Sequence, residues 1–179
     1  MSSVVLVGGG ARSGKSAFAL RRAEALGARR VFVATGQPFD GEMEVRIARH
    51  REERGDRYRT VEAPVELTEA LAALDGTDVV VIDCLTLWLS NLLLGDEAEP
   101  AILARIDRLT AELARRRFHA VVVTSEVGMG VIPPTPLGRR FQDLAGTAHQ
   151  RIARIADEIH LAVLGTILHL PRAAHVAPP

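Results

Sequence analysis

The 179-residue sequence predicts an α/β fold in which a mostly parallel central sheet carries helices on both faces. Short runs of valine, isoleucine and leucine recur along the chain, as strands buried on both faces require. Most of these runs are followed by a segment with the periodicity of a helix. A glycine-rich turn, Gly8-Gly9-Gly10, separates the first run from the first helical segment.

The strands are expected where apolar runs are short and bounded by turn residues. In chain order the parallel strands are expected at Val4–Val7, Arg30–Thr35, Arg57–Glu62, Asp78–Ile82 and Ala120–Thr124. The fourth of these is almost entirely Val and Ile, which is typical of a central strand. The segments Glu158–Leu164 and Thr166–Leu170 flank Gly165 and predict a C-terminal antiparallel hairpin.

The helices are expected at Lys15–Leu26, Gly41–Arg54, Val65–Leu74, Cys84–Leu94, Pro100–Arg117 and Leu137–Ala156. Between the last of these strands and the final helix, Gly128–Pro136 carries two Gly and three Pro and predicts a loop. The length suits one domain over residues 1–170, and the Ala- and Pro-rich residues 171–179 predict a flexible tail.

Charge and composition exclude several classes of protein. Lys plus Arg number 22 and Asp plus Glu number 22, so zero net charge gives no general attraction to nucleic acid. The run Arg115-Arg116-Arg117 is expected to be a solvated face at the end of a helix, where it complements the dipole. No stretch approaches the roughly 18 apolar residues of a membrane span. With no signal peptide evident and Cys84 as the single cysteine, the expected location is the cytoplasm.

A phosphate-binding motif covers residues 9–16. The sequence Gly9-Gly10-Ala11-Arg12-Ser13-Gly14-Lys15-Ser16 matches G-x-x-x-x-G-K-[ST] in full, with a strand before it and a helix after it. Its glycines let backbone N–H groups converge on phosphate oxygens. Lys15 is expected to reach the β- and γ-phosphates, and Ser16 to ligate Mg²⁺. Of the 22 basic residues, 21 are Arg and only Lys15 is Lys, at the position that needs a compact ammonium on a flexible stem.

An acid that follows another buried strand is the expected second Mg²⁺ ligand. Asp83 ends the run that begins at Asp78 and fits this role. The alternative is an N-cap for the helix that starts at Cys84, and the two roles are compatible.

The helix expected at 41–54 carries a histidine on one face. Met43, Ile47 and His50 are spaced i, i+4, i+7, and arginines lie close to His50 in sequence. His50 could contact phosphate, act as a general base or attack phosphorus as a nucleophile; the structural alternative is a histidine on the apolar face of a charged helix. The other histidines lack ligand spacing, so no zinc site is predicted: His119, His149, His160, His169 and His175.

Further short motifs follow the phosphate loop in a characteristic order. They are Ala34-Thr35, Glu42-Met43-x-x-Arg46-Ile47-x-x-His50, Asp83-Cys84-Leu85-Thr86-x-Trp88-x-x-Asn91-Leu92, Ser125-Glu126-Val127-Gly128-x-Gly130-x-x-Pro133 and Arg140-Phe141-x-Asp143-x-Ala145-Gly146-x-x-x-Gln150. In order and spacing the chain resembles, from about residue 4 to 170, the bifunctional adenosylcobinamide kinase/adenosylcobinamide-phosphate guanylyltransferase family of cobalamin biosynthesis.

The resemblance implies a RecA-like P-loop domain that assembles as a homotrimer and catalyses two reactions. In the first, ATP or GTP phosphorylates the aminopropanol hydroxyl of adenosylcobinamide. In the second, GMP passes from GTP to the new phosphate through a covalent histidine–GMP intermediate, at the position of His50. The products are adenosylcobinamide-GDP and pyrophosphate.

The resemblance also implies which residues contact the nucleotide. They are Gly9 to Ser16, Ala34, Thr35, Gly36, Arg51, Glu52, Glu53, Arg54, Glu62 and Asp83, with Lys15 and His50 as the catalytic residues.

Glu126 follows the strand that ends at Thr124 and is a candidate for activating the acceptor hydroxyl; the alternative is an acid that orders the loop or caps it. Two other functions remain open on the residues alone. One is a small-molecule P-loop kinase without a covalent step. The other is a RecA-like ATPase module that binds DNA or a partner, against which the zero net charge and the absence of flanking domains argue.

Overall fold

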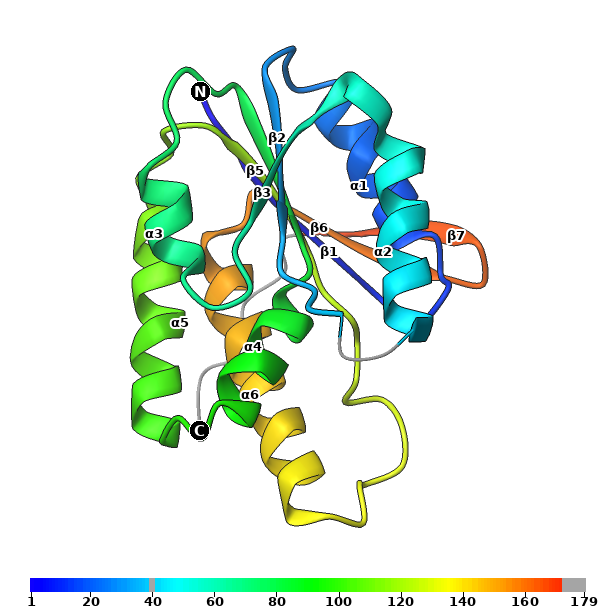
Figure 1. Ribbon diagram of the computed structural model, residues 1–179, viewed down its shortest axis with the longest axis vertical. Helices are drawn as coiled ribbons and strands as arrows, with labels where there is room; N and C mark the ends of the chain where they lie inside the picture. Colours follow the sequence, from blue (N-terminus) through cyan, green and yellow to red (C-terminus); the bar gives the residue numbers. More distant parts are fainter. Residues whose placement is uncertain (39–40, 172–179) are drawn as a thin grey trace.

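The computed structural model describes residues 1–38 and 41–171, apart from the side chains of Glu42, Met43, Arg46, Arg49 and Glu53. Its seven strands form one sheet in the order β3-β2-β4-β5-β1-β6-β7 (Figure 1). Only β7 runs antiparallel to its neighbour. The strands are β1 (Val4–Gly9), β2 (Arg30–Ala34), β3 (Arg59–Glu62), β4 (Val79–Asp83), β5 (His119–Val123), β6 (Glu158–Val163) and β7 (Thr166–Leu170). The mostly parallel sheet and the C-terminal hairpin are therefore confirmed.

Helices cover both faces of this sheet. They are α1 (Lys15–Glu24), α2 (Gly41–Arg54), α3 (Leu67–Ala72), α4 (Leu85–Leu94), α5 (Glu99–Ala114) and α6 (Pro136–Ile155), with a 3₁₀ turn η1 at Gly55–Arg57. Figure 1 shows α1 and α2 on one side of the sheet and α3 to α6 on the other. Alternate strand residues enter two separate hydrophobic cores, so Val4 and Leu6 pack with the four-helix side and Val5 and Val7 with the α1 side.

The strand register brings three predicted site residues into one row. Ala34 of β2 lies opposite Glu62 of β3 on one side and Asp83 of β4 on the other. Residues that lie opposite each other in a sheet share a face, and successive residues alternate between faces. The three residues therefore share the face that α1 covers, at the carboxyl ends of their strands.

The position of β5 sets what lies beside the phosphate loop. β5 is inserted between β1, which leads into that loop, and β4, which ends in Asp83. The chain after β5 continues along β1, where the Thr124 amide donates to the Val7 carbonyl at 2.9 Å and the Glu126 amide to the Gly9 carbonyl at 3.1 Å. Residues 124–126 are thereby held between the two strands that carry the predicted phosphate and Mg²⁺ groups.

The end of α5 differs from the prediction. The helix stops at Ala114 rather than at Arg117, because Arg116 adopts a left-handed φ of 55°. Arg116 pairs with Asp157, and Arg117 pairs with the buried Glu112 and donates to the Leu71 carbonyl at 2.8 Å. The arginine run thus links neighbouring elements instead of forming one solvated helical face.

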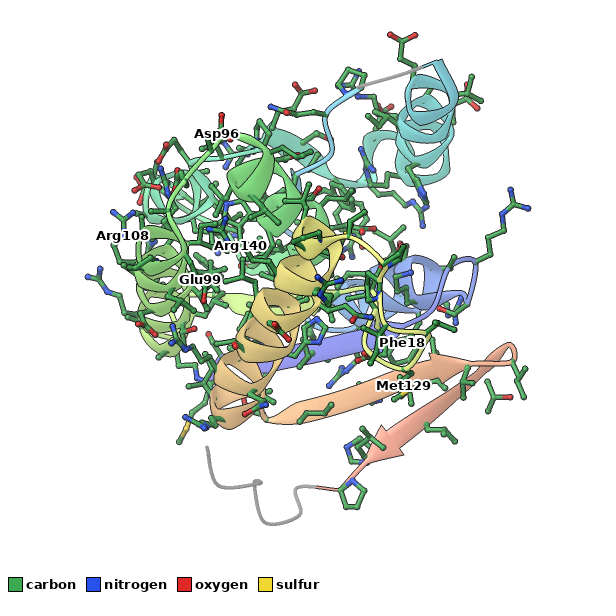
Figure 2. All side chains as sticks on the ribbon, turned by 90° about the horizontal axis from the view of Figure 1, so that it is seen from below. Phe18, Asp96, Glu99, Arg108, Met129 and Arg140 are labelled. Carbon is green, nitrogen blue, oxygen red and sulfur yellow. The ribbon has the colours of Figure 1, made fainter. Side chains whose placement is uncertain are left out.

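Ion pairs also join helices to one another on the side of the sheet that α3 to α6 cover. One example is the pair between Arg140 of α6 and Glu99 of α5, at 3.3 Å (Figure 2). Among the described residues, no helix combines the length and the apolar character needed to cross a membrane. The predicted flexible tail lies, from residue 172 on, outside the described residues.

Candidate active site

A cavity of about 320 Å³ lies at the carboxyl ends of β2, β3 and β4, beneath α2. Many of the residues predicted to contact nucleotide line it together: Lys15, Ser16, Ala34, Gly36, His50, Arg51, Arg54, Glu62 and Asp83. The carboxyl ends of parallel strands are the usual place for ligands in open α/β sheets. These nine residues come from five separate segments of the chain.

The phosphate loop is shaped by its glycines. A side chain at Gly9 would place a Cβ 2.6 Å from the Ala162 carbonyl oxygen, so only glycine lets the loop pass β6 this closely. Gly14 has a φ of 89° and stands as the N-cap of α1. Lys15 is only 6% exposed, and its Nζ donates to the Gly10 carbonyl at 2.9 Å. The ammonium is therefore held against the loop that would receive phosphate.

Ser16 and Asp83 are the candidate Mg²⁺ ligands, and both line the cavity. A hydroxyl and a carboxylate supply the oxygen donors that Mg²⁺ prefers. Within residues 1–38 and 41–171, no group of three or more His, Cys, Asp or Glu side chains is placed to hold a metal ion. One carboxylate and one hydroxyl fit an ion that takes its other ligands from water and nucleotide phosphates.

The alternative capping role predicted for Asp83 is wrong. The N-cap residue of α4 is Cys84, and Asp83 lies one residue before it. Cys84 itself lines the cavity, but burial raises the pKa of its thiol to about 11. A thiol at that pKa is neutral near pH 7 and is not an activated nucleophile.

One side of α2 forms a wall of the cavity. Ile47 and His50 both face it, which confirms their predicted common face, while the Met43 side chain lies outside the described residues. Other residues at helical spacing, Glu44, Ala48, Arg51 and Arg54, line it as well. His50 therefore faces the same cavity as Lys15, although 35 positions separate the two in sequence.

Two arginines attach α2 to the sheet beside His50. The Arg54 guanidinium lies 3.7 Å from the centroid of the Phe32 ring, and Arg54 is only 4% exposed. Arg51 forms an ion pair with Glu62 of β3. Both arginines line the cavity together with His50, so the same wall carries two guanidinium groups that can pair with anionic phosphates.

Thr35 does not present its side chain to the cavity. It is fully buried, donates from Oγ1 to the Cys84 carbonyl at 2.7 Å and accepts from the Cys84 amide at 2.8 Å. Its own carbonyl accepts from Asn91 Nδ2 at 2.8 Å. Since neighbouring strand residues point to opposite faces, Thr35 anchors the end of β2 while Ala34 faces the cavity.

The other predicted contacts lie outside the cavity lining. Gly10, Ala11, Arg12 and Gly14 are exposed on the phosphate loop, and Gly9 and Ser13 are more covered. Glu52 is exposed on α2, and the Glu53 side chain lies outside the described residues.

Several lining residues were missed from the sequence. Phe32 and Thr60 lie two residues before Ala34 and Glu62, so strand alternation could have found them. Ser125 lines the cavity because β5 is inserted between β1 and β4, and no local pattern signals that order.

Fold and site together define a P-loop nucleotide-binding protein with a RecA-like α/β fold. A family model described as "Cobinamide kinase / cobinamide phosphate guanyltransferase" matches residues 5–170. The chain belongs to this family of enzymes, as the resemblance of its motifs predicted.

Curated relatives agree with this assignment, and a solved structure shares the fold. The chain is 40% identical over 178 residues to the bifunctional adenosylcobalamin biosynthesis protein CobU of Escherichia coli, across 90% of this chain and 96% of the relative. It is also 40% identical over 161 residues to CobP of Pseudomonas aeruginosa, across 89% and 92% of the two chains. The flagellar accessory protein FlaH of Methanocaldococcus jannaschii shares the fold at 12% identity and a TM-score of 0.51, over 92% of this chain and 74% of its own.

Proposed function

We propose that the chain phosphorylates the aminopropanol hydroxyl of adenosylcobinamide with ATP or GTP and then transfers GMP from GTP to that phosphate. The observation that carries the proposal is that Lys15 and His50 line the same cavity. The phosphate loop supplies what phosphoryl transfer needs, and the helix α2 supplies a nucleophile flanked by arginines. The products are adenosylcobinamide-GDP and pyrophosphate.

The kinase step relies on positioning and charge. Backbone amides of Gly9 to Gly14 bind the phosphates, and the Lys15 ammonium neutralises the β- and γ-phosphate oxygens. Ser16 and Asp83 would hold Mg²⁺, which supplies further neutralisation of the triphosphate. In this proposal the buried Lys15 ammonium stabilises charge that grows as the γ-phosphoryl group leaves.

The guanylyl step proceeds through His50. An imidazole nitrogen attacks the α-phosphorus of GTP, an N–P bond forms and the bond to the β-phosphate oxygen breaks, so pyrophosphate leaves. A phosphate oxygen of the acceptor then attacks the same phosphorus, and the N–P bond breaks. Because two anions react poorly with each other, the intermediate splits one difficult transfer into two easier ones. Arg51 and Arg54 offset the negative charge at the α-phosphate.

We further propose that the chain acts as a homotrimer, on the basis of its resemblance to the family, and in the cytoplasm, on the basis of its N-terminal sequence and single cysteine. Light scattering should then give a mass about three times the 19.3 kDa of one chain. A monomeric mass at working concentration would refute the trimer.

Labelling with GTP carrying ³²P at the α-phosphate tests the covalent step. With Mg²⁺, the wild-type protein should acquire label that is lost in acid and kept in base, as a phosphoramidate is. His50→Ala should acquire none, and His169→Ala, which removes an exposed imidazole on β7, should label like wild type. Unlabelled wild type, or full labelling of His50→Ala, would eliminate the covalent assignment.

A further inference from the structure

An acidic residue directly follows one of the residues that line the cavity. Ser125 lines the cavity, and its amide is fixed by a 3.1 Å hydrogen bond to Thr86 Oγ1. Glu126 is the next residue, and its amide donates to the Gly9 carbonyl at the start of the phosphate loop. Since β5 lies between β1 and β4, Glu126 follows the strand that separates the phosphate loop from Asp83.

The Glu126 carboxylate is oriented by a hydrogen bond within its own loop, and it lies close to His149 of α6. Its Oε1 accepts from the Gly128 amide at 2.8 Å, and its Oε2 lies 3.7 Å from Nδ1 of His149. The other ring nitrogen of His149 lies 2.7 Å from Thr124 Oγ1. Burial lowers the pKa of His149, which favours a neutral ring between the carboxylate and the hydroxyl. A carboxylate can accept about four hydrogen bonds, so Glu126 keeps acceptor capacity for a substrate hydroxyl.

The chain that follows Glu126 is unusually apolar for an exposed loop. Met129 is 78% exposed, Val131 93% and Ile132 73%. Figure 1 shows this segment extending from the carboxyl end of β5 beyond the sheet to the start of α6, and Figure 2 shows Met129 upon it. Neighbouring apolar side chains exposed on one loop commonly mark a binding surface.

The size of the cavity indicates what this surface binds. About 320 Å³ is near the lower end of the roughly 300–1,000 Å³ typical of small-molecule sites, so a nucleotide occupies most of it. A corrinoid is much larger than a nucleotide base, has apolar ring methyl groups, and carries its reactive hydroxyl at the end of a flexible side chain. Its ring must therefore rest outside the cavity, on a surface from which the hydroxyl can reach the phosphates.

We propose that residues 126–137 form the acceptor site, in which the Glu126 carboxylate receives the hydroxyl proton and Met129, Val131 and Ile132 contact the corrin ring. The inference rests on the kinase reaction proposed above. In that step the acceptor oxygen forms a bond to the γ-phosphorus, the bond from that phosphorus to the bridging oxygen breaks, and the hydroxyl proton moves to Glu126. The nucleoside diphosphate leaves, and Glu126 releases the proton to water. His149 is a positioning residue, because it acts only through Glu126.

Glu126→Gln separates the two reactions. The kinase kcat should fall about 10²- to 10⁴-fold, the usual contribution of a general base. Guanylyl transfer to cobinamide that is already phosphorylated should stay within about twofold of wild type, because a phosphate oxygen needs no deprotonation to attack. Equal loss of both reactions, or an unchanged kinase rate, would overturn the assignment. A wild-type protein that fails to phosphorylate cobinamide would instead refute the underlying function.

The positioning role of His149 is tested by measuring kcat and KM separately. His149→Leu should lower the kinase kcat by about tenfold and leave the KM for cobinamide unchanged, while His149→Gln, whose polar amide can donate to Glu126, should recover most of the rate. A general loss of folded protein, or no recovery in His149→Gln, would remove the positioning role.

The apolar loop is tested by replacing Met129, Val131 and Ile132 together with serine. Because all three are exposed, folding should be unaffected, the KM for cobinamide should rise at least about tenfold, and His50 labelling by GTP should be unchanged. Leu164→Ser, at an equally exposed turn of the β6–β7 hairpin, is the matched control and should change neither. An unchanged KM would overturn the proposal, and so would a fall in assembly mass, which would assign the loop to contacts between copies of the chain.

Discussion

The two faces of the sheet are built differently. The face covered by α3 to α6 buries large side chains such as Trp88, Leu89 and Ile106, each at most 1% exposed. On the other face, α1 packs through the small Ala19 and Ala23, and the space under α2 is left as the cavity. One face therefore supplies most of the large buried apolar side chains, and the other carries the chemistry. Substitutions on the two faces should have separable effects on unfolding and on catalysis.

The largest expected effect is a loss of kinase activity on the face that carries the cavity. Lys15→Ala removes the ammonium held beside the Gly10 carbonyl, so kcat for the kinase should fall roughly 10²- to 10³-fold. Lys15→Arg should restore little, because a planar guanidinium does not fit the place of a compact ammonium. Steady-state kinetics with both nucleotides measures this, and thermal unfolding should show little change. A full kinase rate in Lys15→Ala would contradict the role of the loop.

A substitution in the core under α3 to α6 should lower stability and leave catalysis nearly unchanged. Ile106→Ala leaves a cavity at a fully buried position and should lower the free energy of unfolding by about 2–5 kcal/mol. Urea unfolding measures the loss, while the kinase rate per folded molecule should stay within about twofold. Leu94→Ala, at a residue 56% exposed on α4, is the control and should cost less than about 1 kcal/mol. A large drop in kcat for Ile106→Ala would show that the faces are not independent.

A smaller effect is expected at the wall beside His50. Arg54→Met keeps much of the bulk over Phe32 but removes the charge, so the KM for GTP should rise by about tenfold. The rate of His50 labelling at low GTP should fall with it. Unchanged labelling would mean that Arg54 only packs against the sheet.

The smallest effect concerns acid stability, where α1 meets β6. Arg22 pairs with Glu158 and holds the pKa of that carboxyl at about 2, against an ordinary value of 4.5. The folded state then binds fewer protons than the unfolded state, so this pair stabilises fully above about pH 4.5 and is lost as pH falls toward 2. Glu158→Gln should cost about 1 kcal/mol or less at pH 7, and its difference from wild type should shrink between pH 4.5 and 2. A difference that is constant with pH in urea titrations would count against this pair.

Sequence patterns predicted the strands and helices well where the pattern was long and apolar. The errors of these predictions lie at the ends of the helices and strands. The helix expected from Val65 begins at Leu67, and the strand expected from Arg57 begins at Arg59 because η1 occupies the residues before it. Such ends depend on one or two backbone angles, such as the left-handed φ of 51° at Gly55, which hydrophobic periodicity does not report.

The site was predictable where chemistry imposes a local motif. The phosphate loop has one, and α2 shows helical spacing around His50. Contacts between distant segments were not predictable in this way, since Glu126 and His149 are 23 positions apart and share no periodic pattern. Their pairing depends on where α6 returns to the sheet, and the facing of Thr35 away from the cavity depends on strand pleating.

The insertion of β5 between β1 and β4 also fixes the distance between these two strands. Neighbouring strands lie about 4.8 Å apart, so the strand that ends in the phosphate loop and the strand that ends in Asp83 are separated by about 10 Å. That width is set by backbone hydrogen bonds and not by any side chain. Substitution of residues around the site can change which groups face the gap, but the gap itself changes only if a strand is added or removed.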